Sequence, residues 1–159
     1  MNQKKKYIVK DYMQKQVATI SKNATFKEAV EKMIHAKTNG LVVVNGNNQV
    51  IGIISSWDLI QHIVPDYLEE DRHLASFESP DVFEKRIQEV QDNPITKFMT
   101  MKVLTVMATD SIMEASTLLS EFRIRQLPVV NDEKKLVGYI NRTDIKRAVG
   151  EALGISFVF

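Results

Sequence analysis

The chain contains an internal repeat: residues 9–63 and 95–149 align without a gap at a constant offset of 86 positions. Met13 aligns with Met99, and Asp58 aligns with Asp144. Twelve of the 55 aligned pairs are identical, and many of the others exchange one apolar residue for another. A repeat of this kind constrains the architecture before any local pattern does. We therefore expect two copies of one folding unit, packed as a pseudo-symmetric pair.

Each repeat carries the same series of local signals. Thr25 and Ser111, each followed three positions later by Glu, form capping boxes that predict the start of a helix. Apolar runs predict strands at 17–20, 41–44, 50–54 and 136–140. A short helix is predicted to close each repeat, at 57–63 and 143–149. The predicted order is strand, helix, strand, strand, helix, a mixed α/β fold. One repeat has too little core to be stable alone, so we expect the two to pack as one module.

The segments outside the repeats are less regular. Residues 64–94 begin with four acids and continue with apolar residues at helical spacing, which predicts an acidic loop and then a helix from about Pro80 to Val90. A solvated surface is the favoured interpretation of the acids, ahead of a metal site. The tail, residues 150–159, ends in an apolar run. Packing on the module, packing at a subunit interface and a frayed end all remain open for it.

Composition limits the function classes. The net charge of +1 does not favour a nucleic-acid or membrane surface as partner. The chain has no cysteine, which excludes disulfides and thiolate chemistry and agrees with a cytoplasmic location. No apolar run approaches the roughly 20 residues that span a bilayer. The three histidines lack ligand spacing, so no metal site is predicted. No catalytic set of nucleophile and base is visible, and we expect no enzyme activity.

The turn from strand to helix at 52–58 is the motif with chemical content. Ser55 is placed to begin a helix, and Asp58 follows three positions later. A helix N-terminus and a serine hydroxyl suit a phosphate, and a carboxylate one turn on suits the hydroxyls of a ribose. The same spacing is also an ordinary capping box with no ligand. Trp57 between them has two interpretations, a core anchor for the helix or a stacking surface for a base.

The doubled strand–helix–strand–strand–helix pattern, the Leu127-Pro128-Val129-Val130 strand and the two turns from Gly to Asp resemble a pair of cystathionine-β-synthase (CBS) domains, a Bateman module. The resemblance covers both repeats. It implies adenosine-containing ligands in clefts between the repeats, assembly as a homodimer, and no required cofactor.

The resemblance also implies site residues. In a primary cleft, Ser55 matches the family hydroxyl near the phosphate, Asp58 matches the acid for the ribose, and Arg125 stands where a basic group for phosphate is often found. An exposed cation or an ion pair is the alternative for Arg125. The implied primary set is Ile53, Ser55, Ser56, Asp58, Met99, Leu104, Ile124 and Arg125.

A secondary, pseudo-symmetric cleft is implied with the set Met13, Ala18, Thr38, Asn39, Tyr139, Asn141 and Asp144. It has Asn141 in place of the hydroxyl and Asn39 in place of the cation. We therefore expect weaker phosphate contacts there than in the primary cleft.

Three functions follow for this sequence. The first is a stand-alone, non-catalytic sensor that binds AMP, ADP or ATP and signals to a separate effector protein. The second is a structural or dimerisation module whose clefts stay empty, which Asn141 slightly favours. The third is an enzyme, which the sequence does not support. Other adenosyl ligands, namely a cyclic dinucleotide, S-adenosylmethionine or NAD, remain alternatives for the sensor.

Overall fold

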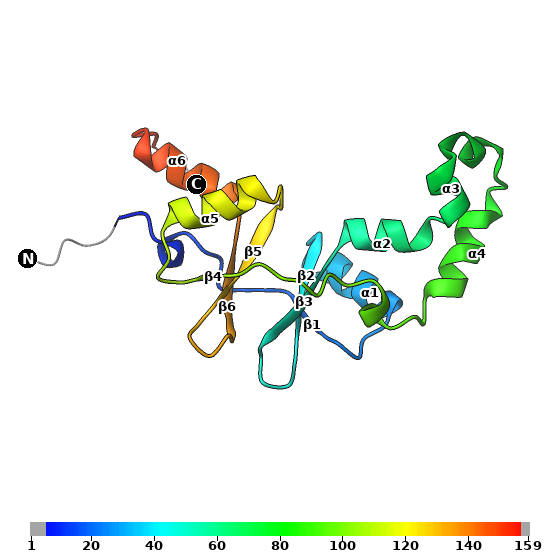
Figure 1. Ribbon diagram of the computed structural model, residues 1–159, viewed down its shortest axis with the longest axis horizontal. Helices are drawn as coiled ribbons and strands as arrows, with labels where there is room; N and C mark the ends of the chain where they lie inside the picture. Colours follow the sequence, from blue (N-terminus) through cyan, green and yellow to red (C-terminus); the bar gives the residue numbers. More distant parts are fainter. Residues whose placement is uncertain (1–5, 157–159) are drawn as a thin grey trace, which may run out of the picture. The chain divides into compact units, whose positions relative to one another are not determined.

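The computed structural model describes residues 6–156 and contains two three-stranded sheets, one from each repeat (Figure 1). In both sheets the first two strands are parallel, because a helix carries the chain back between them. The sheets have the orders β1-β2-β3 and β4-β5-β6, with bounds Thr19–Ser21, Gly40–Val44, Val50–Ser55, Val106–Met107, Gln126–Val130 and Leu136–Asn141. Each repeat follows the predicted order of strand, helix, strand, strand, helix, so the predicted mixed α/β class is confirmed.

The helices of the two repeats begin where the sequence predicts. Thr25 caps the N-terminus of the first helix and Ser111 caps the equivalent helix of the second repeat, each in a full capping box. Both boxes satisfy helix N–H groups that would otherwise lack partners. The helices of the repeats are α1 (Phe26–Ala36), α2 (Ser56–Ile63), α5 (Ile112–Glu121) and α6 (Arg142–Ala152).

The chain forms two compact units whose boundaries cross the repeat boundaries. Among the described residues, unit 1 contains 6–17, 46–50 and 103–156, and unit 2 contains 18–45 and 51–102. The sheet of each repeat therefore packs with the first residues of the other repeat. The cause is burial of apolar side chains: Val9 of the 3-10 helix η1 (Val9–Asp11) is fully buried in the core of unit 1, and Ile95 of η3 (Ile95–Lys97) is fully buried in that of unit 2.

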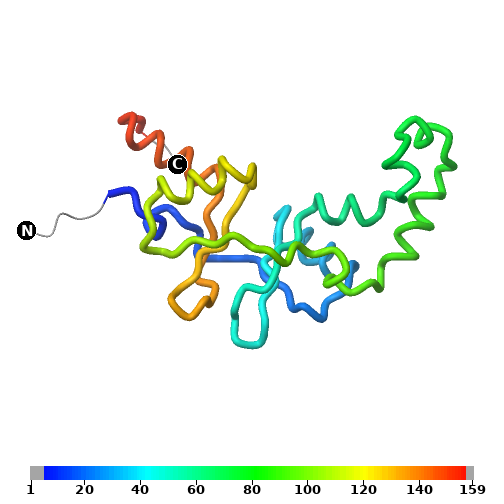
Figure 2. Tube along the Cα trace, viewed as in Figure 1, coloured from blue at the N-terminus to red at the C-terminus, as the bar shows by residue number. Residues whose placement is uncertain are grey.

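Polar contacts also hold the first segment to unit 1. The Tyr12 hydroxyl donates to a carboxylate oxygen of Glu151 at 2.6 Å, and Arg147 donates to the carbonyl of Tyr12 at 2.8 Å. Burial, together with the Glu151 carboxylate, raises the pKa of Tyr12 to about 12. Figure 2 shows this segment in blue; Gln14 near its end bridges to Tyr139 of strand β6 in the same unit.

Residues 64–94, which we name the arm, are more helical than the sequence suggested. The helix predicted from about Pro80 to Val90 is α4 (Asp81–Val90), as expected. The predicted acidic loop is wrong: it contains α3 (Asp66–Glu70) and the 3-10 helix η2 (Arg72–Phe77). Acids in the first turn of a helix favour the helical state, since they face its positive end, and Asp66 and Glu69 lie in that turn of α3.

The base of the arm is fixed to α2. Arg86 of α4 donates to the carbonyls of His62 and Ile63, both at 3.2 Å, and so caps the C-terminus of α2. The His62 ring stacks on Phe98 with centroids 4.6 Å apart, and its Nε2 lies 3.0 Å from Nδ2 of Asn93. His62 is thus the residue at which α2 and both ends of the arm meet.

This geometry predicts a pH dependence of stability. Burial, and then the charges of Arg86 and Lys97, lower the pKa of His62. The unfolded chain consequently takes up a proton at a higher pH than the folded chain does, and stability falls as the pH drops through the ordinary range of histidine. The His62→Gln variant should lose less of its melting temperature than the wild type between about pH 7.5 and about pH 5.5.

The exposed His35 on α1 provides the matched control for this measurement. His35→Gln should keep the wild-type pH dependence of the melting temperature. If His62→Gln and the wild type give parallel curves, His62 does not couple protonation to folding.

Candidate functional site

The Ser55–Asp58 turn joins β3 to α2 and forms a capping box. The Asp58 carboxylate accepts from the backbone N–H of Ser55 at 2.7 Å and from its hydroxyl at 3.1 Å, while the Ser55 hydroxyl accepts from the N–H of Asp58 at 3.4 Å. Both side chains are half-buried. The capping interpretation is therefore correct for the chain as it stands, and a partly open carboxylate lies at the N-terminus of α2.

A pocket of 320 Å³ lies beside this turn, wholly within unit 2. Its lining combines apolar residues of α1 and α2 with the segment that follows α1: Val30, Met33, Ile34, Lys37, Thr38, Asn39, Ser56 and Leu59. The N–H of Ser56 donates to the carbonyl of Asn39 at 2.9 Å. Thr38 and Asn39, which the resemblance assigns to the secondary cleft, thus lie next to Ser56 of the primary set.

The equivalent turn of the second repeat is closed. Asn141 caps α6, and the Asp144 carboxylate accepts from the N–H of Asn141 at 3.0 Å. Its other oxygen accepts from the Gln14 amide at 2.7 Å, and Asp144 is only 2% exposed. Burial, and then the Asp144 charge, raise the pKa of Tyr139. The two acids that the repeat aligns therefore differ in accessibility: Asp58 is half-buried, and Asp144 is buried with both oxygens bonded.

Met99 and Met13 of the two predicted sets occupy equivalent positions, each over a glycine of the sheet. A Cβ at Gly52 would lie 2.9 Å from the Met99 sulfur, and one at Gly138 would lie 3.0 Å from the Met13 sulfur. The backbone beside each methionine pairs with the sheet, since Thr100 bridges to Ile53 and Gln14 bridges to Tyr139. The missing side chains at the two glycines make this close approach possible.

The predicted primary set divides between the two units. Unit 2 brings together Ile53, Ser55, Ser56, Asp58 and Met99, whereas Leu104, Ile124 and Arg125 belong to unit 1. Leu104 and Ile124 are partly buried against the core of unit 1. Arg125 is exposed, and within residues 6–156 its guanidinium forms no ion pair, so the ion-pair alternative does not hold there.

The predicted secondary set divides in the same way. Unit 1 brings together Met13, Tyr139, Asn141 and Asp144, and unit 2 contains Ala18, Thr38 and Asn39. Ala18 packs against the core of unit 2, and its carbonyl accepts from the N–H of Val42.

Two features of the turns differ from the sequence analysis or escaped it. Trp57 is 65% exposed, so its interpretation as a core anchor is wrong, whereas its neighbours Ser55 and Asp58 are half-buried. Gln14 was missed as the partner of Asp144. Its only signal is a polar residue beside Met13, and the repeat places Thr100 at the equivalent position.

Within the described part of the chain, no group of three His, Cys, Asp or Glu side chains is arranged to hold a metal ion. Among the same residues, no helix combines the length and apolar character that crossing a bilayer requires.

The CBS domain family profile matches residues 9–65 and 95–151, and the chain belongs to this family. Its structure resembles that of CBSX2 from Arabidopsis thaliana, with a TM-score of 0.74 and 25% identity over 94% of this chain and 99% of that one. A CBSX2 structure in complex with AMP gives a TM-score of 0.70 at 24% identity, over 92% and 98% of the two chains. The CBS domain pair of protein MJ0100, in complex with 5′-methylthioadenosine and S-adenosyl-L-methionine, gives 0.68 at 25% identity, over 91% and 97%.

Among curated relatives, a homoserine O-acetyltransferase of Methanocorpusculum labreanum is 29% identical over 132 residues, which are 83% of this chain and 22% of that protein. The chain thus spans less than a quarter of the length of this relative. The family profile accounts for both repeats of the present chain.

Proposed function

We propose that this chain is a non-catalytic regulatory module that binds an adenosine-containing ligand and signals to a separate effector protein. The observation that carries the proposal is the half-buried Asp58 beside Ser55 at the N-terminus of α2. It occurs in a chain that is 25% identical to a CBS domain pair solved with two adenosyl ligands. Binding would change the relative populations of the conformations of the module.

The proposed ligand contacts are those of the primary set. Asp58 would accept the ribose hydroxyls, the N-terminus of α2 and Ser55 would face a phosphate, and Arg125 would neutralise its charge. Ile53, Met99, Leu104 and Ile124 would supply apolar contacts to the base. The secondary set ranks lower, because Gln14 and Asn141 already occupy both oxygens of Asp144.

The candidate ligands differ in whether they contain a phosphate, and the module has residues that can distinguish them on this basis. Methylthioadenosine and S-adenosylmethionine contain adenosine without a phosphate, whereas AMP, ADP and ATP contain both. Arg125 has no ion-pair partner among the described residues, which supports a phosphorylated ligand such as AMP. A cytoplasmic location stays a prediction based on the absence of cysteine.

A second candidate is a structural module whose clefts stay empty. The observation that favours it is the pair of complete capping boxes, which use both acids within the chain.

We also propose that the chain forms a homodimer. Exposed apolar residues on the helices of both repeats, and at the end of α6, support this: Ile34, Trp57, Ile60, Met113, Val149 and Leu153.

Thermal unfolding with a ligand panel tests the proposal. An adenosyl ligand at a hundred times its dissociation constant should stabilise the chain by about 2.7 kcal/mol. For a chain of this size the melting temperature should rise by roughly 5–10 °C. The panel is AMP, ATP, methylthioadenosine and S-adenosylmethionine, with GMP and GTP as matched controls. The module with empty clefts becomes the better interpretation if no adenosyl ligand at millimolar concentration shifts the transition.

A further inference from the structure

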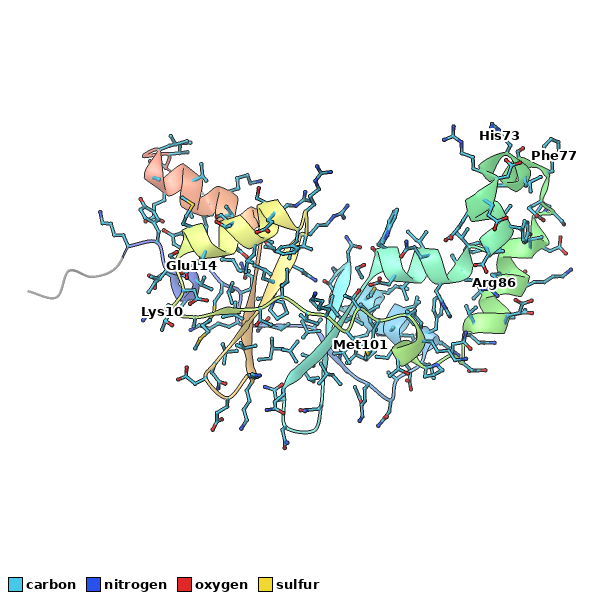
Figure 3. All side chains as sticks on the ribbon, viewed as in Figure 1. Lys10, His73, Phe77, Arg86, Met101 and Glu114 are labelled. Carbon is cyan, nitrogen blue, oxygen red and sulfur yellow. The ribbon has the colours of Figure 1, made fainter. Side chains whose placement is uncertain are left out.

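The arm carries an exposed aromatic side chain at its tip. Phe77, the last residue of η2, is 84% exposed, and Figure 3 shows it with His73 at the end of the arm farthest from the strands of unit 2. Leu74 and Phe83 nearby are also exposed. Of the residues in α3, η2 and α4 only Val90, at the base, is buried. Aromatic side chains are the residues that most often dominate binding energy at protein interfaces, so the tip has the composition of a docking surface.

The pocket beside the Ser55–Asp58 turn can receive such a side chain. Its apolar lining comes from Val30, Met33 and Ile34 of α1 and from Leu59 of α2, and the exposed Lys37 lies at its edge. Its volume of 320 Å³ is at the lower end of the range of volumes that is typical of ligand pockets in proteins.

The arm of the same chain does not fill this pocket. The pocket uses Ser56 and Leu59 in the first turn of α2, whereas Arg86 fixes the arm to the carbonyls of the last turn of that helix. Figure 3 shows Arg86 near this junction and Phe77 beyond it, on the side away from the strands of unit 2. Phe77 can therefore enter this pocket only in another molecule.

Charge favours a second copy of this chain as that molecule. Residues 64–94 contain nine Asp or Glu and three Lys or Arg, a formal charge of −6, so the rest of the chain carries +7 to reach the total of +1. Two arms repel each other, whereas an arm and the body of another copy attract. Complementary charge of this kind guides association and selects between alternative docking modes.

We propose that the arm of one copy inserts Phe77 into the α1–α2 pocket of a second copy, with acids of the tip such as Glu78 facing Lys37. One such contact leaves the second arm and the second pocket free. A two-fold rotation pairs these as well, and the reciprocal exchange closes the assembly as a dimer. The exchange does not require a bound ligand, and the pocket shares Ser56 with the proposed primary set.

Sedimentation equilibrium of the full chain tests the exchange. Phe77→Ser removes two equivalent contacts from each dimer, so at about tenfold per contact the dimer dissociation constant should rise about 100-fold. Met101→Ser is the matched control, since Met101 is an exposed apolar residue of unit 2 outside the arm and the pocket, at 71% exposure. A wild type that stays monomeric at tens of micromolar, or a Phe77→Ser dimer as tight as the wild type, overturns the proposal.

Disulfide trapping tests the contact directly, because the chain has no cysteine of its own. Ser76→Cys at the tip and Lys37→Cys at the pocket are made in separate proteins, mixed and oxidised. The mixed disulfide should form at least several-fold faster than with Lys134→Cys, an exposed lysine in a turn of unit 1. Equal rates for the two pairs overturn the proposal. Because Ser56 lines the pocket and also belongs to the proposed primary set, the ligand panel is repeated on Phe77→Ser: its melting shifts report on ligand binding without the exchange, so failure of the exchange and failure of the proposed function are separate results.

Discussion

Replacing Asp144 with alanine should lower the free energy of unfolding by about 3–4 kcal/mol, a loss of roughly 6–16 °C in melting temperature for a chain of this size. The carboxylate accepts from Asn141 on one oxygen and from Gln14 on the other, in a site that is 2% exposed. The variant therefore loses part of a helix cap, worth about 1 kcal/mol, and leaves donors of the half-buried Asn141 and Gln14 without partners, at about 1–1.5 kcal/mol each. Chemical denaturation followed by circular dichroism measures the change.

Asp58→Ala is the matched control, because Asp58 is the aligned residue of the other repeat. It forms the same capping box and is half-buried, and its carboxylate bonds only to Ser55 among the described residues, so the expected cost is about 1 kcal/mol. Gln14→Ala should fall between the two, since it removes one bond of the buried carboxylate and leaves the cap intact. Equal losses for Asp58→Ala and Asp144→Ala would show that the capping box, and not the Gln14 contact, accounts for the stability at both turns.

The sequence predicted the local parts of this fold because their causes are local. Thr25 and Ser111 cap helices through contacts three residues away, and the same spacing is visible in the sequence. The internal repeat supplied the element order of the second repeat from that of the first. The contact from Gln14 to Asp144 joins residues 130 positions apart, and no local pattern encodes it.

The arm shows where composition alone misleads. Four acids in the range 66–71 suggested a loop, because charge runs are usually solvated. The acids are solvated, yet α3 forms, since two of them stand in the first turn of the helix, where negative charge is favourable. Of the two interpretations of Trp57, the core anchor is wrong: the capping box of Ser55 and Asp58 fixes the start of α2, and Trp57 is 65% exposed.

The candidate site was predictable as a set of residues and not as an environment. The spacing of Ser55 and Asp58 can be recognised from the sequence alone. The same spacing occurs in a helix cap and in a ligand site, so it does not distinguish the two. The same is true of Asn141 and Asp144. The difference between the turns lies in Gln14, which closes one of them and has no counterpart at the other: the equivalent Thr100 pairs with Ile53 through its backbone.

Ligand affinity should therefore depend far more on Asp58 than on Asp144. Loss of hydrogen bonds from the ribose to a charged acceptor costs about 1.5–3 kcal/mol, so Asp58→Ala should weaken AMP and methylthioadenosine alike by roughly 10- to 150-fold. Asp144→Asn, chosen because it keeps the size of the buried side chain, should change either affinity by less than about threefold. Isothermal titration well below the melting temperature of each variant measures these affinities.

The Arg125→Ala variant tests the contact to the phosphate independently of the contacts to the rest of the ligand. Arg125 is exposed and without an ion pair among the described residues, so its charge is available to a phosphate, and methylthioadenosine has none. The variant should weaken AMP by about tenfold, the effect of one charge-assisted contact, and leave methylthioadenosine within about twofold. Equal weakening of both ligands would assign Arg125 to the support of the fold. Binding that survives Asp58→Ala and disappears in Asp144→Asn would move the ligand to the second turn, which could accept it only by displacing Gln14 from the carboxylate.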